Sequence, residues 1–421
     1  MREDRAKQRI AILHYAAPPV IGGVEATIYH HARGLAALGY QVQVVAGRGE
    51  AFDDRVAFHH IPEIDSRHPE VLAIKEELDE GQVGQGFHLL QHRIAAALRE
   101  ALADIDTCIV HNAFTLHKNL PLTAALHQLA EEGCVRFIAW CHDLAWTNPL
   151  YLPQLKDRHP WNLLKKPLNG VRYVTVSHSR RRELASLLGL SEEEIRVIPP
   201  GVEPLEFLGL TTTTKHLVER WDLLCAEPLM LLPARLTRRK NIELALRVTA
   251  ALREKEWAPK LIVTGPPGPH DARNIAYLHR LGELCQGLGL REEVIFLHEC
   301  QDEDGERIEV SDAMVADLYR LADLLLLPSS QEGFGIPLLE AGLARLPTFC
   351  ADIPPFRESG EGVAHFFSLE DDPAEIAQRI AAFLAEHPAY QMRRRVLRRY
   401  TWSAILIREI VPLLEEEGCD G

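Results

Sequence analysis

The 421-residue sequence has no apolar run that approaches the roughly 18 residues of a membrane-spanning helix. Its charged N-terminus, MREDRAKQR, is not followed by the apolar core of a signal peptide. The eight cysteines are scattered and include no C-x-x-C pair, so neither a zinc site nor a disulfide framework is indicated. These absences together predict a cytoplasmic protein with reduced thiols.

The sequence also lacks an excess of positive charge. Lys and Arg number 46 against 60 Asp and Glu, and the formal net charge of −14 argues against nucleic acid as a general partner. The 20 histidines include the pairs His30-His31 and His59-His60, but these pairs lack metal-ligand spacing, so we expect no metal. No signature of a pyridoxal-phosphate lysine is present, and we expect no cofactor.

The length of the chain exceeds one ordinary core and suits two domains. Hydrophobic residues make up 47% and charged residues 25%, as in an average globular protein. Residues 10–14 predict a buried strand, 24–38 a helix and 41–45 the next strand. This order is a βαβ unit, which predicts an α/β fold with a parallel sheet. Residues 52–93 show no such regular pattern.

Gly22 and Gly23 lie between the first predicted strand and its helix. They do not form the G-x-G-x-x-G pattern, so a dinucleotide fingerprint is not indicated. Two adjacent glycines still allow the backbone to approach a ligand closely. A tight turn without any ligand is an equal alternative for this pair.

A glycine-flanked loop in the second half of the chain is a candidate ligand site. Residues 324–327 predict a buried strand, and a new helix starts near Pro337 after the loop. Backbone N–H groups at such a helix start favour anions and hydroxyls. Glu332 and Glu340 border the loop, and carboxylates accept paired hydrogen bonds from the hydroxyls of a sugar or a ribose. An equal alternative without any ligand is that Glu332 is a charged loop residue and Glu340 merely stabilises the start of the helix.

Four cations crowd the turn between a predicted strand at 229–232 and a helix that begins near Ile242. They are Arg235, Arg238, Arg239 and Lys240. The helix dipole disfavours positive charge at this end, so a bound anion such as a diphosphate would explain the cluster. The alternative is a solvated basic turn.

Polar residues follow two predicted strands of the first half, at 107–111 and 135–140. They are His111 and Asn112 after the first strand, and His142 and Asp143 after the second. Residues just past the carboxyl ends of strands border the ligand crevice in open α/β sheets. Packed or surface imidazoles are the alternative for each histidine. Trp146 follows on a loop, where its ring either packs on a sugar or anchors the loop itself.

The string EGFGIPLLEAGLARLPTFCAD resembles the signature of the family 4 retaining glycosyltransferases. The resemblance extends to GGVE, to AWCHD, to VSHSRRRELA with EIRVIPPGVEP, and to the R-x4-K spacing of Arg235 and Lys240. Where the family commonly has a glycine, this chain has Arg345-Leu346, which affects no catalytic residue.

This resemblance implies the GT-B fold, in which two Rossmann-like, doubly wound parallel-sheet domains face each other across a cleft. It implies an acceptor-side domain of residues 1–206, with a C-terminal helix 401–421 packing back on it. It further implies a nucleotide-sugar domain of residues 207–400, in which the acidic segment 299–311 adjoins the nucleotide base without an identifiable base-reading residue.

Residue roles follow from the same resemblance. Glu332 contacts the transferred sugar, Glu340 holds the ribose, and Arg235 and Lys240 grip the diphosphate. The predicted catalytic residues are His142, Arg235, Lys240 and Glu332. The predicted donor-binding residues are Gly22, Gly23, Arg235, Lys240, Glu332, Gly333, Phe334, Gly335, Ile336 and Glu340. The predicted acceptor-side residues are His111, Asn112, Asp143 and Trp146.

The predicted function is metal-independent transfer of a hexose, with retention, from a nucleotide-diphosphate sugar of the UDP-glucose or GDP-mannose type to an acceptor hydroxyl. The alternatives are a GT-B nucleotide-sugar epimerase and a non-catalytic nucleotide-sugar binding protein. Residues 392–400 contain five arginines, which either pair with neighbouring acids or make weak peripheral contact with anionic lipid.

Overall fold

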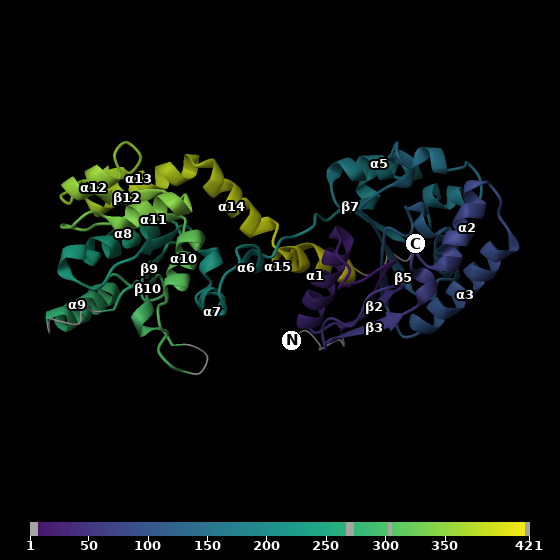
Figure 1. Ribbon diagram of the computed structural model, residues 1–421, viewed down its shortest axis with the longest axis horizontal. Coiled ribbons are helices and arrows are strands. Elements are labelled where there is room, and N and C mark those ends of the chain that lie inside the picture. Colours follow the sequence, from purple (N-terminus) through teal and green to yellow (C-terminus); the bar gives the residue numbers. More distant parts are fainter. Residues whose placement is uncertain (1–6, 267–272, 302–304, 417–421) are drawn as a thin grey trace. The chain divides into compact units, whose positions relative to one another are not determined.

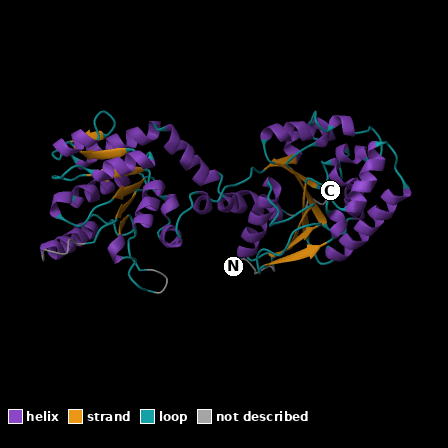
Figure 2. Ribbon diagram, viewed as in Figure 1, coloured by secondary structure: helices purple, strands orange, loops and turns teal. Residues whose placement is uncertain are grey.

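The computed structural model describes residues 7–266, 273–301 and 305–416, and the chain divides into two compact units (Figure 1). The first unit comprises residues 1–202 and 399–421, and the second comprises residues 203–398. The sequence analysis placed the divisions after residues 206 and 400, four and two residues further along the chain. Each unit is an α/β domain built on its own parallel sheet (Figure 2).

The first unit has a seven-stranded sheet in the order β3-β2-β1-β4-β5-β6-β7. Its strands are β1 Arg9–His14, β2 Gln41–Ala46, β3 Val56–His60, β4 Thr107–His111, β5 Arg136–Cys141, β6 Arg172–Thr175 and β7 Ile195–Val197. Its longer helices are α1 Gly23–Ala37, α2 Pro69–Asp79, α3 Gln85–Ala101, α4 Leu120–Glu132 and α5 His178–Leu188. The chain ends on this unit with α15 Trp402–Ile405, a π-helical turn Leu406–Ile410 and α16 Val411–Glu415.

Both faces of the first sheet are buried, as expected for parallel strands between two layers of helices. Alternate residues of β1 supply the two faces: Ala11 and Leu13 pack with α2, α3 and α4, while Ile10 and Ile12 pack with α1 and the C-terminal helices. Helix α1 approaches the C-terminal segment closely, because a Cβ on Gly34 would lie 2.1 Å from Leu406 Cδ1. The C-terminal segment is therefore an integral part of this unit.

The second unit has a six-stranded sheet in the order β10-β9-β8-β11-β12-β13. Its strands are β8 Leu229–Leu232, β9 Lys260–Val263, β10 Val294–Phe296, β11 Leu324–Leu327, β12 Thr348–Ala351 and β13 His365–Phe367. Its helices are α6 Pro204–Phe207, α7 Thr212–Arg220, α8 Ile242–Glu254, α9 Arg273–Gly287, α10 Asp312–Leu321, α11 Ile336–Ala344, α12 Pro354–Ser359, α13 Pro373–Glu386 and α14 Pro388–Arg399.

Both sheets are doubly wound, which confirms the predicted fold class. The strand order runs outward from β1 to one edge and then restarts at β4, and β8 and β11 repeat this pattern in the second unit. The point at which the order reverses is where open α/β sheets bind ligands, just outside the carboxyl ends of the strands. It lies between β1 and β4 in one unit and between β8 and β11 in the other.

The irregular region expected at 52–93 instead contains β3, α2 and most of α3. Strand β3 is at the edge of the sheet and only Val56 in it is buried, so it shows no apolar run. Helix α2 buries just Val71, Ile74 and Leu78. The apolar signal of these elements was too sparse to distinguish them from loops.

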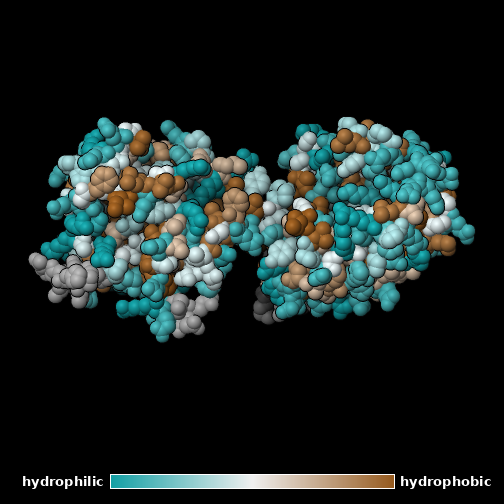
Figure 3. Space-filling model, viewed as in Figure 1, coloured by the Kyte–Doolittle hydropathy of each residue, from teal (hydrophilic) through white to brown (hydrophobic). Residues whose placement is uncertain are grey.

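Three of the five arginines of α14 form ion pairs inside the second unit. Arg393 pairs with Asp323, and Arg394 and Arg398 both pair with Glu227. On the face drawn in Figure 3, hydrophilic side chains cover most of the surface of both units. Within the described ranges, no helix is long and apolar enough to cross a membrane.

Three further expectations concern cysteines, metals and the acidic segment. All seven cysteines in the described part of the chain are free thiols, and Cys419 lies outside it. In that same part, no group of three or more His, Cys, Asp or Glu is placed to hold a metal ion. Of the acidic segment 299–311, residues 302–304 lie outside the described residues, and an antiparallel bridge pairs Gln301 with Arg307.

Candidate functional site

Lys240 lies at the carboxyl end of β8, at the reversal point of the second sheet. The chain leaves β8 and forms a short 3-10 turn over Arg238–Lys240, and Asn241 at φ 48° then starts α8. Lys240 is 8% exposed, which is unusual for a lysine unless it has a partner. Its Nζ lies 2.5 Å from Oε1 of Glu332, which follows β11.

Glu332 lies between two cations. Nη1 of Arg239 donates to its second oxygen, Oε2, at 3.0 Å. The two loops are also joined through their backbones, because the N–H of Ser330 donates to the carbonyl of Arg239 at 2.8 Å. The loop after β8 and the loop after β11 are thus held together where the strand order reverses.

The charge balance of this cluster favours an anion. Burial by itself raises the pKa of Glu332, but hydrogen bonds from Lys240 and Ser329 and the charges of both cations hold the pKa below its ordinary value. Glu332 is therefore ionised at neutral pH and neutralises only one of the two cations. Arg235 adds a third positive charge on the same connection; it is exposed and has no hydrogen bond or ion pair in the described part of the chain.

The backbone around Arg235 is fixed although its side chain is not. A Cβ on Gly265 would lie 2.6 Å from the Cα of Arg235, so the segment after β9 packs directly against it. Leu236 donates its N–H to the carbonyl of Pro266 at 3.1 Å. The side chain of Arg235 is thus free to reach a ligand from a rigid base.

The two glycines of the loop before α11 differ in what they require. Gly335 has φ 100°, and a Cβ there would lie 2.8 Å from Cδ1 of Phe356, so both conformation and space demand glycine. Gly333 has neither constraint, and no atom of the described residues lies within 4 Å of its Cβ position. The open space beside Gly333 leaves the loop backbone accessible. Phe334 and Ile336 beside it are exposed, at 45% and 62%.

Glu340 is exposed on α11 and accepts a hydrogen bond of 2.6 Å from the hydroxyl of Tyr319 to Oε2. Burial and this bond raise the pKa of Tyr319, which therefore remains a donor. The two residues line an open cavity of about 530 Å³ between α10 and α11. In the described residues no hydrogen bond or ion pair joins Glu340 to Lys240 or Glu332.

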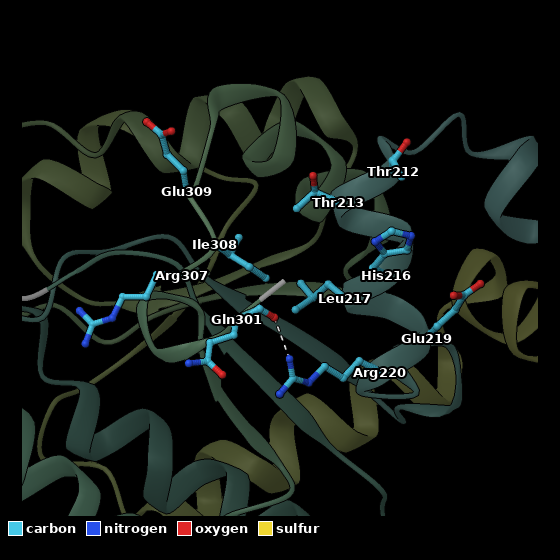
Figure 4. A pocket seen from close by; sticks show the side chains of 10 residues that line it. All are labelled: Thr212, Thr213, His216, Leu217, Glu219, Arg220, Gln301, Arg307, Ile308 and Glu309. Atoms are coloured by element: carbon cyan, nitrogen blue, oxygen red, sulfur yellow. Dashed lines mark hydrogen bonds between the residues drawn. The ribbon is translucent and has the colours of Figure 1, made fainter. Parts of the chain in front are cut away.

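A second cavity, of about 830 Å³, lies between α7 and the segment 307–309 (Figure 4). Arg220 on its wall donates to the carbonyl of Gln301 at 2.7 Å. None of the predicted site residues lines this cavity. We therefore assign the candidate site to the reversal point of the sheet.

In the first unit, Gly22 and Gly23 precede α1 just after β1. Gly22 has φ −179°, an extended conformation that any residue adopts, and a Cβ there would meet only the movable side chain of Glu25. Nothing lies within 4 Å of a Cβ on Gly23. In the described part of the chain, neither glycine is required by backbone strain or by packing, and the open space beside Gly23 leaves its backbone accessible.

The carboxyl ends of the central strands of the first sheet carry a chain of histidines. His14 ends β1, His111 ends β4 and His142 directly follows β5. Nδ1 of His14 lies 2.9 Å from the carbonyl oxygen of His111, and Nδ1 of His111 lies 2.9 Å from Nε2 of His142. Adjacent strands thus place the three histidines in one hydrogen-bonded series, in which the ring of His14 bonds the backbone of His111 and the ring of His111 bonds that of His142.

Asn112 fixes the backbone on which His142 stands. It adopts the left-handed conformation at φ 60°, which asparagine tolerates better than most residues. Its side-chain oxygen accepts the N–H groups of His142 at 2.8 Å and Asp143 at 3.1 Å. Asn112 is 4% exposed and His111 is 0% exposed, so their side chains support His142 and are not available to an acceptor.

The histidine series is uncharged at neutral pH. Burial lowers the pKa of His14 to about 3 and that of His142 to about 4. Burial also lowers the pKa of His31, which packs against His111 from α1, to about 3, and holds that of His111 well below its ordinary value. The first unit therefore presents neutral imidazole at this point, in contrast to the ionic cluster of the second.

Trp146 and Asp143 have partners within their own unit. The indole N–H of Trp146 donates to the carbonyl of Trp161 at 3.1 Å, and Nζ of Lys165 lies 4.5 Å from its ring centroid. Trp146 thus anchors its own loop. Asp143 is half exposed, and Nη2 of Arg180 lies 3.6 Å from its carboxylate.

The structure therefore brings Lys240 and Glu332 together and brings His111, Asn112 and His142 together. Sequence reasoning did not single out Arg239, Tyr319, His14 or His31. The chain position of His14, at the end of a predicted strand like His111, was the available signal for it. Arg239 was seen only as one of four cations on its turn, since its neighbour Glu332 lies 93 residues further along the chain.

Two family models match the chain, one for each unit. Residues 21–205 match the model described as Glycosyltransferase Family 4. Residues 223–399 match the model described as Glycosyl transferases group 1. The two matches contain every predicted site residue.

Curated relatives carry similar names. An uncharacterized glycosyltransferase of Methanocaldococcus jannaschii is 28% identical over 61% of this chain, but the match spans only 63% of that relative's length. A mannosylglucosylglycerate synthase of Thermotoga maritima is 24% identical over 83% of this chain and 82% of the relative. A D-inositol 3-phosphate glycosyltransferase of Nocardia farcinica is 24% identical over 96% of this chain and 87% of the relative.

Proposed function

This chain belongs to the family 4 glycosyltransferases and is built from the two doubly wound domains of the GT-B fold, and we propose that it transfers a hexose from a nucleotide-diphosphate sugar to an acceptor hydroxyl. The observation that carries the proposal is the cluster at the reversal point of the second sheet. There Lys240 and Arg239 share the carboxylate of Glu332, at 2.5 and 3.0 Å.

The cations of the cluster bind the diphosphate. Lys240 and Arg239 are held on a rigid turn, and Arg235 joins them from the same connection. Negative charge grows on the diphosphate as the bond to the anomeric carbon breaks, and preorganised donors stabilise it at that moment. One such donor contributes on the order of 3 kcal/mol to lowering the barrier. This clamp supplies the charge stabilisation without calling on a metal or cofactor.

Glu332 and Glu340 bind hydroxyls. Glu332 is ionised and orients the sugar, while the amides of Gly333, Phe334, Gly335 and Ile336 hold hydroxyl and phosphate oxygens. One carboxylate oxygen of Glu340 accepts a hydrogen bond from Tyr319, and the other accepts hydrogen bonds from the ribose. Gly22 and Gly23 admit the diphosphate close to the start of α1.

His142 acts on the donor sugar from the first unit. It is partly exposed, is held by Asn112 and remains neutral, so it is suited to hydrogen bonding with a sugar hydroxyl. We propose transfer with retention of the anomeric configuration, as in the family that the signature resembles. The epimerase and binding-protein alternatives are not favoured, because the relatives are named as transferases and synthases.

A thermal-shift panel of UDP, GDP, ADP and their sugars tests the proposal and identifies the base. The mannosyl product in the name of the Thermotoga relative makes GDP-mannose a priority, beside UDP-glucose. We expect one nucleotide and its sugar to raise the melting temperature and that sugar to be hydrolysed slowly without an acceptor. A panel in which no nucleotide stabilises the protein would contradict the proposal, and binding without hydrolysis or transfer would indicate a binding protein.

A further inference from the structure

The hydrogen bond between His111 and His142 determines which ring nitrogen of His142 is available to a ligand. Nδ1 of His111 lies 2.9 Å from Nε2 of His142, so Nε2 of His142 is occupied. The remaining ring nitrogen of His142, Nδ1, is the one available to a substrate. What it offers, a proton or a lone pair, depends on which ring donates in the bond.

Two neutral imidazoles allow two arrangements. In the first, His111 is protonated on Nδ1 and donates, and His142 then carries its own proton on Nδ1. In the second, His142 is protonated on Nε2 and donates, and His111 then carries its proton on Nε2. The arrangements differ in the atom that is left without a partner inside the protein.

The buried surroundings of His111 distinguish the two arrangements. Nε2 of His111 is buried and has no hydrogen-bond partner among the residues that the structure describes, and the residue is 0% exposed. Its surroundings are the rings of His31 and Trp140, at centroid distances of 5.7 Å each, and both nitrogens of His31 are also unpaired. The second arrangement would bury an N–H with no acceptor, which is rarer in proteins than an unpaired acceptor. The first arrangement leaves only a lone pair there.

The neighbours of His142 on its own segment act on its charge and on its backbone. Among the neighbouring charges, Asp143 raises the proton affinity of His142. Asp143 occupies the adjacent backbone position and is half exposed, and Nη2 of Arg180 lies 3.6 Å from its carboxylate. Asn112 holds the backbone of both residues and so keeps this geometry fixed.

We propose that His111 is a positioning residue that donates from Nδ1 to Nε2 of His142 and thereby fixes His142 as an outward N–H donor. In this state His142 donates a hydrogen bond to a sugar oxygen and does not accept a proton from the acceptor hydroxyl. The lone pair on Nε2 of His111 is buried, so a proton cannot leave the protein through this nitrogen. This inference deepens the proposed function and rests on it for the identity of the ligand, but the tautomer itself does not.

The direct test is the ring-nitrogen spectrum of the full chain labelled with ¹⁵N-histidine, near neutral pH and without ligand. Protonated and bare ring nitrogens resonate far apart, and the signals of His142 are identified by their absence in His142→Gln. We expect His142 to be protonated on Nδ1 and bare on Nε2. Protonation on Nε2 would overturn the proposal, whether or not the protein proves to be a transferase.

Variants of His111 give the second test. An asparagine places an amide N–H near the position of Nδ1, whereas leucine removes the donor. We expect His111→Leu to shift His142 towards the Nε2 tautomer and to lower the hydrolysis rate of UDP-glucose or GDP-mannose by about tenfold at unchanged KM, the worth of one hydrogen bond. His111→Asn should restore most of that rate.

His127 provides a matched control, since it is also a buried histidine of the first unit, at 4% exposure, with an unpaired Nδ1. His127→Leu should leave the tautomer of His142 and the hydrolysis rate unchanged. An unaltered His142 tautomer in His111→Leu would contradict the positioning role. If no nucleotide sugar is hydrolysed, the proposed function fails, and the spectra still decide the tautomer.

Discussion

Both sheets reverse their strand order beside their first strand, between β1 and β4 in the first unit and between β8 and β11 in the second. In the first unit the polar groups at this point are imidazoles kept neutral by burial. In the second unit they are a carboxylate and two cations, with Nζ of Lys240 2.5 Å from Glu332. The same scaffold thus carries a series of neutral histidines in one unit and an ionic cluster in the other.

In the proposed reaction, this difference gives the two units different parts. The neutral histidines of the first unit are already hydrogen-bonded to one another, and His14 and His111 are buried. The series therefore offers a ligand one fixed hydrogen-bonding group, the ring of His142, without attracting ions. In the ionic cluster, Glu332 partly neutralises Lys240 and Arg239 as long as no stronger anion is bound. A diphosphate, with more charge than one carboxylate, is suited to compete for Lys240 and Arg239 and to leave Glu332 for hydroxyls.

We expect acidification to reveal the largest difference between the two units, a difference in folding stability. The pKa values of His14 and His31 are lowered by burial from 6.5 to about 3. The unfolded chain takes up these protons near pH 6.5 and the folded chain does not, so stability falls as the pH drops from about 6.5 towards 4. Each such histidine contributes a loss of about 1.4 kcal/mol per pH unit.

Neighbouring charges modify this slope without changing its sign. Lys118 beside His14 and His30 beside His31 lower the pKa values further, while Asp143 partly restores that of His142. Hydrogen exchange between pH 7 and 4.5, followed by mass spectrometry, should show loss of protection in β1, β4 and β5 before β8 and β11. Simultaneous loss in both sheets would remove the contrast.

Lys240→Ala should give the largest effect on activity. It removes a buried cation from the diphosphate and leaves Glu332 with Arg239 alone, so we expect the transfer or hydrolysis rate to fall by about a hundredfold or more. Arg238→Ala is the control, because Arg238 is exposed on the same turn. Near-normal turnover of Lys240→Ala would remove the clamp from the mechanism.

Glu340→Ala should weaken nucleotide binding by about tenfold or more, since a hydrogen bond to a charged group contributes about 1.5–3 kcal/mol. Calorimetry with the nucleoside diphosphate identified by the panel would measure this. Tyr319→Phe removes only the partner of Glu340 and should cost less. Unchanged affinity in Glu340→Ala would exclude the ribose role.

His142→Ala should have the smallest of these effects. We expect hydrolysis or transfer to slow by about tenfold, the worth of one neutral hydrogen bond, with nucleotide affinity unchanged. Trp146→Phe is a useful comparison, because its indole N–H serves the carbonyl of Trp161 and not the ligand in our account. A loss of nucleotide affinity in His142→Ala without a change in rate would reverse the assignment of the two units.

The sequence predicted parallel α/β sheets because buried parallel strands such as Leu324–Leu327 are short, continuous apolar runs between breakers, whereas the doubly wound arrangement in two domains was implied by the family resemblance. It did not predict β3, whose residues are mostly exposed at the sheet edge. Among site residues, Lys240 and Glu332 could be singled out from their loops. Their contact could not, because it depends on the crossover geometry between β8 and β11.

The roles of His111 and Asn112 illustrate the same limit. Their position after a strand marked them as site residues, but burial decides whether a side chain meets a ligand or supports another side chain. Burial at 0% and 4% gives both a supporting role. Trp146 had two open alternatives in the sequence, and its hydrogen bond to Trp161 favours anchoring of its own loop.

The central claim is that a nucleotide-diphosphate sugar binds at the reversal point of the second sheet. Hydrogen exchange of the full chain, with and without the nucleotide sugar that stabilises it most, tests this directly. We predict slower exchange in residues 235–241 and 330–340. Exchange that is unchanged in both segments while the ligand is bound would contradict the account.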